Sequence, residues 1–215
     1  MSGEKVPPTL AVLDLLEFCH RVVAKPISRS FHSYYGHQHL VFDPEVGQQD
    51  FIDEVNRILA RNGLAYELKA DGTVSRLAPL VLRDALGSAN FNTGDAELDT
   101  LLLASVGKYL DPDQAIRRES LEKLWDAWER LKTLDYPNDK KKSVQMLLKK
   151  ATPQDELRAV LEKEAWEVTE IGNDFRIRHS EMTKIPIQRS DDIDYLFHRL
   201  FALIRLLLRA TGRGK

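Results

Sequence analysis

The sequence of 215 residues contains one cysteine, Cys19, so it cannot form a framework of disulfide bonds. Cys19 lies in an apolar run, Leu13–Val23, and this position predicts a small buried hydrophobic side chain rather than a reactive thiol. The chain therefore has to be held together by a packed core. Its length is enough for one large domain or for two small ones.

The motifs of several large enzyme classes are also absent. The sequence has no G-x-x-x-x-G-K-[ST], no G-x-G-x-x-G, no H-E-x-x-H and no G-x-S-x-G. Nucleotide hydrolysis, dinucleotide redox chemistry and the common hydrolase reactions therefore have no support in the sequence. We expect neither a cofactor nor a bound metal ion.

No apolar run is long enough to cross a lipid bilayer. The most apolar stretch near either end, Tyr195–Leu208, is too short and carries His198, Arg199 and Arg205. The N-terminus, MSGEKVPPTL, lacks the basic start and the continuous apolar segment of a signal peptide. We therefore expect a cytoplasmic protein without a membrane partner.

Neither sign of charge is in large excess. The chain has 31 lysine and arginine residues against 33 aspartate and glutamate residues, a net charge of −2. Such a balance creates no overall field that would attract nucleic acid or an anionic membrane. The composition, 43% hydrophobic and 30% charged, is ordinary for a globular protein.

The first half of the sequence mixes helical and strand patterns. Helical spacing predicts helices over residues 9–24 and 47–61, and Asn62-Gly63 is a typical helix end. The alternating runs on either side of Asp71-Gly72 favour a hairpin with a type I′ turn. Together with a short strand over 39–42, the runs at 65–69 and 73–77 predict a three-stranded antiparallel sheet.

The second half reads as almost wholly helical. Apolar periodicity predicts helices over 79–86, 95–107, 112–133 and 153–171, and a last helix capped by Ser190. Asp111-Pro112 and Thr152-Pro153 are typical helix starts, and Gly172 is expected to end a helix. The predicted fold class is mainly α, a C-terminal helical bundle with a smaller N-terminal α+β part that contains a short antiparallel sheet. We place the parts at 1–95 and 96–215, with one continuous domain as the alternative.

The most informative polar segment, IGNDFRIRHSEMTK, spans residues 171–184 between two of these helices. Arg176 and Arg178 supply guanidinium groups that can bind a phosphate in two places and stabilise developing charge, and His179 can transfer protons near neutral pH. Asn173 could orient the phosphate and Glu181 could fix the imidazole tautomer. The alternative is that these side chains cap helix ends and form ion pairs with one another.

A helix, a short Arg/Asn/His motif and a closing amphipathic helix together resemble the HEPN superfamily over residues 112–210. The resemblance implies a protein of bacterial defence, abortive-infection or toxin–antitoxin type. It implies metal-independent RNA cleavage through Arg176, Arg178 and His179, in a dimer that brings two motifs together. The arginine and histidine are closer together here than in that family. A non-catalytic protein that binds a partner or itself is therefore the alternative function.

Two further groups bear on RNA binding. Asp126 and Arg130 lie off the apolar stripe that holds Trp125 and Trp128, and they could reach the polar segment and help to position a substrate. The alternative is an i,i+4 ion pair between them on the surface. The lysines at 140–142, 149 and 150 could contact RNA phosphates, or they could form the charged face of a helix.

His37 and His39 share one face of a strand, so both could bind one metal ion if a distant residue such as His32 completed the set. The alternative is aromatic packing around Tyr34 and Tyr35 with hydrogen-bonded histidines. A third hypothesis for the whole chain is a sensor whose α+β part binds a ligand between His37–Phe42 and the hairpin around Asp71-Gly72.

Overall fold

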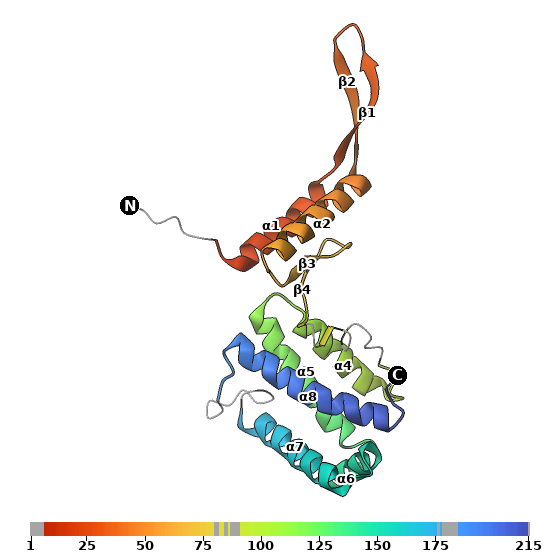
Figure 1. The fold of residues 1–215 in the computed structure, drawn as a ribbon, viewed down its shortest axis with the longest axis vertical. Coiled ribbons are helices and arrows are strands. Elements are labelled where there is room, and N and C mark those ends of the chain that lie inside the picture. Colours follow the sequence, from red (N-terminus) through yellow and green to blue (C-terminus); the bar gives the residue numbers. More distant parts are fainter. Residues whose placement is uncertain are drawn as a thin grey trace, which may run out of the picture. The chain divides into compact units, whose positions relative to one another are not determined.

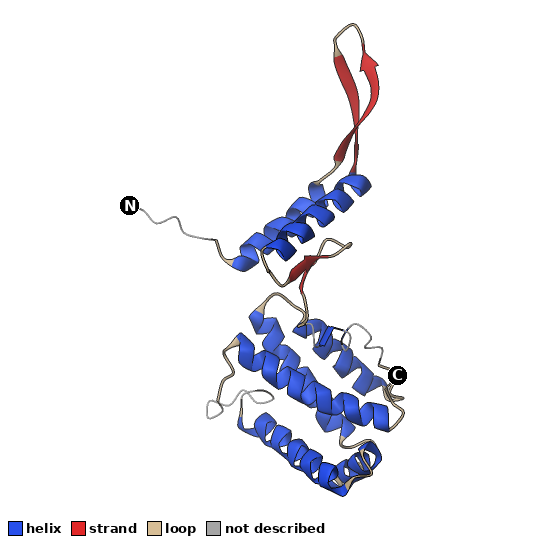
Figure 2. Cartoon of the chain, viewed as in Figure 1, coloured by secondary structure: helices blue, strands red, loops and turns tan. Residues whose placement is uncertain are grey.

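The computed structural model describes residues 7–79, 82, 83, 86, 91–175, 177 and 185–214 (Figure 1). The chain divides into two units, Met1–Ala78 and Pro79–Lys215. The predicted class is confirmed, because helices dominate and the short strands of the described residues lie in the N-terminal unit (Figure 2). The predicted division after residue 95 lies inside the second unit. Phe91 forms a β-bridge with Gly214 there, and Asp95 caps a helix of that unit.

Two helices, α1 (Thr9–Val22) and α2 (Pro44–Arg61), form the body of the N-terminal unit. Asp43 caps α2 by accepting a hydrogen bond from the backbone N–H of Val46, and the helix ends before Gly63, whose φ of 67° only glycine adopts easily. The two helices enclose one small core together with a hairpin over residues 66–76. Its buried members are Leu13, Ile52, Val55, Leu59, Leu68 and Val74.

The strands form two separate hairpins, so the predicted three-stranded sheet is wrong. Strand β1 (Lys25–His32) pairs with β2 (His37–Asp43), and β3 (Tyr66–Leu68) pairs with β4 (Val74–Arg76), both antiparallel. Sequence patterns missed β1 because its side chains are exposed on both faces. Without one buried face, a strand shows no alternation of apolar and polar residues.

The turn between β3 and β4 also differs from the prediction. Gly72 has a φ of 83°, but Asp71 does not have the positive φ that a type I′ turn requires. The backbone N–H of Gly72 donates to the carbonyl of Lys69, and the N–H of Lys69 donates to Thr73. This pattern is a three-residue loop with the glycine in the left-handed region. Asp71 stabilises it by accepting hydrogen bonds from the backbone and hydroxyl of Thr73.

The C-terminal unit is a helical bundle, as predicted. Its described helices are α4 (Ala96–Tyr109), α5 (Gln114–Leu131), α6 (Lys140–Ala151), α7 (Asp155–Asp174) and α8 (Ser190–Ala210). Helix α8 has nine buried residues and packs against α5 and α6, while α4 packs on α5. Of the predicted helix over 79–86, residues 80, 81, 84 and 85 lie outside the described residues.

Helix α8 is joined to α7 by one arginine. Arg199 donates to both oxygens of Glu164, at 2.6 and 2.9 Å, and to Glu167 at 2.6 Å. The hydrogen bonds that the Arg199 guanidinium donates to Glu164 raise its pKa further, so the group is fully charged. None of the helices in the described part of the chain is both long and apolar enough to cross a membrane.

Three helices begin one or two residues away from the position that their sequence signals suggest: α5 and α7 begin later, and α8 begins earlier. Helix α5 starts at Gln114 with Asp113 as its cap, two residues beyond the predicted proline start. Helix α7 starts at Asp155, after Thr152 has accepted a hydrogen bond from the backbone of Gln154. Ser190 is the first residue of α8 instead of its cap. In the first two cases the Asp or Thr side chain stabilises the turn that precedes the helix.

The prediction that Gly172 ends a helix is wrong, because α7 continues to Asp174. The glycine is needed for packing. A Cβ at this position would lie 2.3 Å from the Trp125 ring. That ring is buried and its N–H donates to the carbonyl of Val168 at 2.8 Å, so it cannot move aside.

We predict that Gly172→Ala destabilises the C-terminal unit by about 1–3 kcal/mol through overpacking. Gly107→Ala is the matched control, since that glycine also lies inside a helix but a Cβ there would meet no atom within 4 Å. It should stabilise the unit by about 0.5–1 kcal/mol. Urea unfolding followed by tryptophan fluorescence measures both effects. Equal behaviour of the two variants would contradict the packing argument.

Candidate functional site

Four of the predicted catalytic and positioning residues lie outside the described residues. These are Arg176, Arg178, His179 and Glu181. Their described neighbours make defined contacts: Phe175 and Ile185 form a parallel β-bridge, and Ile177 is buried. Phe175, at the end of α7, therefore lies beside Ile185, which precedes α8. This bridge joins the described residues on the two sides of the polar segment.

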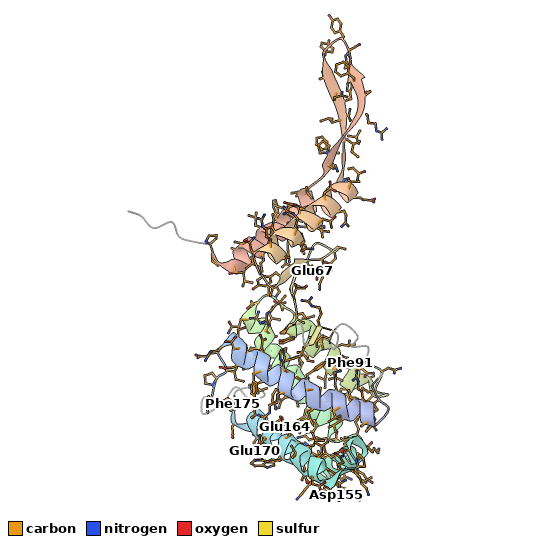
Figure 3. All side chains as sticks on the ribbon, in the orientation of Figure 1. Glu67, Phe91, Asp155, Glu164, Glu170 and Phe175 are labelled. Atoms are coloured by element: carbon orange, nitrogen blue, oxygen red, sulfur yellow. The ribbon has the colours of Figure 1, made fainter. Side chains whose placement is uncertain are left out.

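Asn173, predicted to orient a phosphate, lies exposed on the last turn of α7. Its side-chain amide donates to Glu170 at 3.4 Å, a weak contact that leaves the amide open to solvent. Figure 3 labels Glu170 and Phe175 at this end of the helix. The Asn173 side chain is thus accessible beside the predicted site.

Arg130, predicted either to position a substrate or to pair with Asp126, is bound to the start of α4. Its guanidinium contacts both oxygens of Asp95, at 3.1 and 2.7 Å, and also Glu97 at 3.0 Å. Asp95 is the cap of α4 and accepts a hydrogen bond from the backbone of Leu98. Asp126 is half-buried on α5. Arg130 therefore joins α5 to the capped end of α4.

Trp125 and Trp128 are fully buried, as the apolar stripe predicts. Their indole N–H groups donate to α7, Trp125 to the carbonyl of Val168 and Trp128 to the hydroxyl of Thr169. The two tryptophans thus align α7 on α5.

The exposed apolar side chains gather mainly in the N-terminal unit. Those of its helices and arm that are more than half exposed include Leu15, Phe18, Val22, Phe31, Tyr34, Tyr35 and Phe42. Large apolar side chains exposed in one part of a chain are typical of protein association sites. We call the set formed by the outer face of α1 and the β1–β2 hairpin the association surface.

Helix α1 is apolar on two opposite sides. Leu13 faces the core and Leu16 packs against it. Leu15, Phe18 and Val22, spaced three and four residues apart, form a second stripe that is exposed. A second apolar stripe on the solvent side of a helix is typical of a helix that packs against a further surface. Cys19, predicted to be buried, is half-buried at the border between the two sides.

The β1–β2 hairpin projects beyond the ends of α1 and α2 as an arm (Figure 1). The pairing register shifts between Ser28 and Ser30, so Arg29 is the extra residue of a bulge. On one face the pair Ser28–Leu40 lies between Pro26–Phe42 and Phe31–Gln38, and the opposite face carries Ile27–Val41. Side chains extend from both faces into solvent (Figure 3).

Three histidines gather near the tip of this arm. The rings of His32, His37 and His39 lie 5.1–5.5 Å apart, and Tyr35 stands 4.9 Å from His32. His32 is directly opposite His37 across the hairpin, so it lies nearer to the H-x-H pair than the sequence alone suggested. Within the described ranges, no three histidine, cysteine or acidic residues are arranged to hold a metal ion. The observed contacts are those of an aromatic cluster, which is largely exposed.

Comparison with known proteins adds no relative: no protein-family model, no curated protein and no solved structure matches the chain. The resemblance to the HEPN superfamily therefore stays a prediction from the sequence. Function has to be inferred from the geometry of the described residues.

The ion pair between Asp95 and Arg130 generates a prediction about pH. The hydrogen bond from Arg130 is the main cause that lowers the pKa of the Asp95 carboxyl below its usual 3.8. A carboxyl with a lowered pKa in the folded state adds stability above its unfolded pKa and loses it as the pH falls. Asp95→Asn keeps a capping side chain and should be less stable than the wild type at pH 7, by less than about 1 kcal/mol because the pair is partly exposed.

This difference in unfolding free energy should shrink as the pH falls below about 4, where the unfolded chain becomes protonated first. Urea unfolding at several pH values measures it. Asp139→Asn is the control, since Asp139 caps α6 and makes no ion pair within the described residues. A difference in unfolding free energy between Asp95→Asn and the wild type that stays constant down to about pH 2 would refute the stabilising role of the Asp95–Arg130 ion pair.

Proposed function

We propose that the protein functions through self-association, with the association surface of the N-terminal unit as the contact between two copies. The observation that carries this proposal is the β1–β2 arm, whose residues are exposed on both faces except for the partly buried His32 and Asp43. A lone two-stranded hairpin in water is marginally stable at best. An arm of eight- and seven-residue strands needs a further surface to be well ordered.

A second copy is the occupant that fits the arm best. Each strand of a two-stranded hairpin has one edge with unpaired N–H and C=O groups. Around a two-fold axis, such an edge pairs with its own copy in the antiparallel direction, because the same residues serve both partners. Two arms would then form one four-stranded sheet. The exposed stripe of α1 offers a second self-complementary contact of the helix-to-helix kind.

The amount of apolar surface is sufficient for a stable dimer. An aromatic side chain buries about 150–250 Å², and the five exposed aromatic residues of the association surface are each more than half exposed. Together they offer on the order of 600 Å². The aliphatic residues of α1 and the arm bring the area near the roughly 800 Å² per partner of a typical interface.

A hollow at the base of the arm supports the proposal that this surface binds another protein surface. It has a volume of about 380 Å³ and is walled by Ile27, Val41 and Phe42, with Arg29 and Glu45 among its other lining residues. Apolar walls beside one guanidinium group and the two carboxylates of Asp43 and Glu45 suit an inserted side chain from another protein surface.

We predict that the full chain has twice its single-chain mass of 24.6 kDa in sedimentation or light-scattering measurements at micromolar concentration. Phe18→Glu on α1 and Phe42→Glu on the arm should each shift the protein toward the single-chain mass, because a carboxylate is costly to bury in an apolar contact. Circular dichroism should show that both variants keep their helices.

Leu103→Glu is the matched control, since Leu103 of the other unit is 53% exposed and Phe18 is 52% exposed. This variant should associate like the wild type. A wild type that stays at the single-chain mass would refute self-association. Equal loss in the control would show that the effect does not come from the association surface.

A second function, metal-independent RNA cleavage, is supported by the residues around the polar segment. In this proposal Arg176 and Arg178 bind the phosphate, His179 acts as acid or base, and the 2′-hydroxyl of the substrate is the nucleophile. The bridge between Phe175 and Ile185 and the burial of Ile177 favour it, because they fix the described residues on both sides of the segment. Self-association is compatible with this chemistry, since a dimer brings two such segments into one assembly.

For this activity we predict that the purified protein cleaves single-stranded RNA in the presence of a metal chelator but leaves DNA of the same sequence intact. His179→Ala should slow cleavage by roughly 100-fold or more. Arg189→Ala, an exposed position after the segment, is the control and should cleave normally. Identical RNA patterns for the wild type and His179→Ala would rule the activity out.

A further inference from the structure

The C-terminal unit contains a cavity of about 610 Å³ between α6, α7 and the end of α5. Its size is in the range of pockets that bind small molecules. Most of the side chains around it are of two kinds, four lysines and a group of apolar residues with one exposed indole. Its lining consists of Lys132, Lys140, Lys141, Val144, Ala159, Glu162, Lys163, Ala165, Trp166 and Thr169.

Small side chains on α7 make this space. Ala159 and Ala165 lie on α7 at the cavity, and Val144 faces them from α6. Alanine side chains leave room where larger ones would close the contact between the two helices. Trp166, on the same stretch of α7, is 63% exposed at this opening. An exposed indole beside an apolar hollow is a platform for a flat apolar group.

A partly buried ion cluster forms the polar side of the cavity. Lys132 is 5% exposed, and its ammonium donates to Glu129 at 2.6 Å and to Thr169 at 3.2 Å. Lys140 donates to the other oxygen of Glu129 at 2.9 Å. Burial raises the pKa of the Glu129 carboxyl, but the hydrogen bonds from the two lysines outweigh it and keep the pKa below its ordinary value. The Glu129 carboxylate thus accepts hydrogen bonds from two ammonium groups.

Lys141 and Lys163 add two further positive charges at the cavity. Among the described residues, the Lys141 ammonium makes no ion pair, and Lys163 lies 3.8 Å from Glu167 in a largely exposed contact. Glu162 is the single acidic residue of the lining. The cavity therefore attracts an anion.

From these observations we propose that the cavity binds a nucleotide, with the phosphate near Lys140 and Lys141 and the base stacked on Trp166. The ligand must carry both an anion and a flat aromatic ring, because lysines and an exposed indole occur together. A free nucleotide and the end of an RNA strand share this chemistry. The site goes beyond the proposed self-association, and none of its residues belongs to the association surface.

The test is isothermal titration calorimetry of the full chain with uridine monophosphate, adenosine monophosphate, inorganic phosphate and an eight-nucleotide single-stranded RNA. We expect saturable binding of the nucleotides and weaker binding of phosphate alone. Trp166→Ala should weaken nucleotide binding about tenfold through lost stacking. Lys141→Gln should weaken it about fivefold to tenfold through a lost charged hydrogen bond.

Lys149→Gln is the control variant, because Lys149 is an exposed lysine of the same helix that does not line the cavity. It should bind like the wild type. Of the three tryptophans only Trp166 is exposed, so quenching of fluorescence by the nucleotide provides a second readout in the wild type.

The absence of saturable nucleotide binding to the wild type would overturn the proposal. Equal affinity in Trp166→Ala and the wild type would also overturn it, as would phosphate binding as tightly as the nucleotides. Stronger binding of the oligonucleotide than of either mononucleotide would support the strand end as the natural ligand. The outcome is separable from self-association, since Phe18→Glu should leave nucleotide affinity unchanged.

Discussion

The burial of α8 is the interaction on which the C-terminal unit depends. Nine of its 21 residues are buried, and Phe197 stacks on Tyr109 of α4 at 3.9 Å between ring centres. Burial of apolar side chains is the largest favourable term in folding, and α8 buries more of them than any other described helix. The other helices are positioned by their contacts with α8 or with α5, and the polar contacts of Arg199 and Trp125 determine how α7 lies on them.

The N-terminal unit, in contrast, exposes more apolar side chains than it buries. Its core has six buried residues, while its exposed apolar side chains are more numerous. Small units have little interior, so a large apolar content has to be covered in another way. Self-association is the explanation that uses the open edges of the arm and the free stripe of α1 together. In this interpretation, association between two copies covers the apolar surface that the small core leaves exposed.

Charged residues in the C-terminal unit have different structural roles that their spacing in the sequence does not reveal. Arg130 holds the cap of α4, whereas Lys132, two positions later, is buried beside Glu129 at the cavity. A charge that is paired and buried fixes the geometry around it, because an unpaired one would be costly there. The lysines that remain exposed at the cavity are those that can meet a ligand.

The sequence by itself determined the mainly helical class, the approximate positions of most helices and the burial of Trp125 and Trp128. These features follow from apolar periodicity and local turn chemistry, which depend on neighbouring residues only. It did not reveal β1, because a strand exposed on both faces has no alternating pattern. It also assigned Gly172 to a helix end, since the need for glycine arises from the Trp125 ring on another helix.

Only the tertiary structure decided that His32 stands opposite His37, that Arg130 binds Asp95, and that Lys132, Lys140 and Trp166 surround one cavity. Each of these depends on contacts between elements distant in the sequence. The physical reason is that local patterns specify which face of a helix is buried, while the partner on that face is chosen by packing of the whole unit.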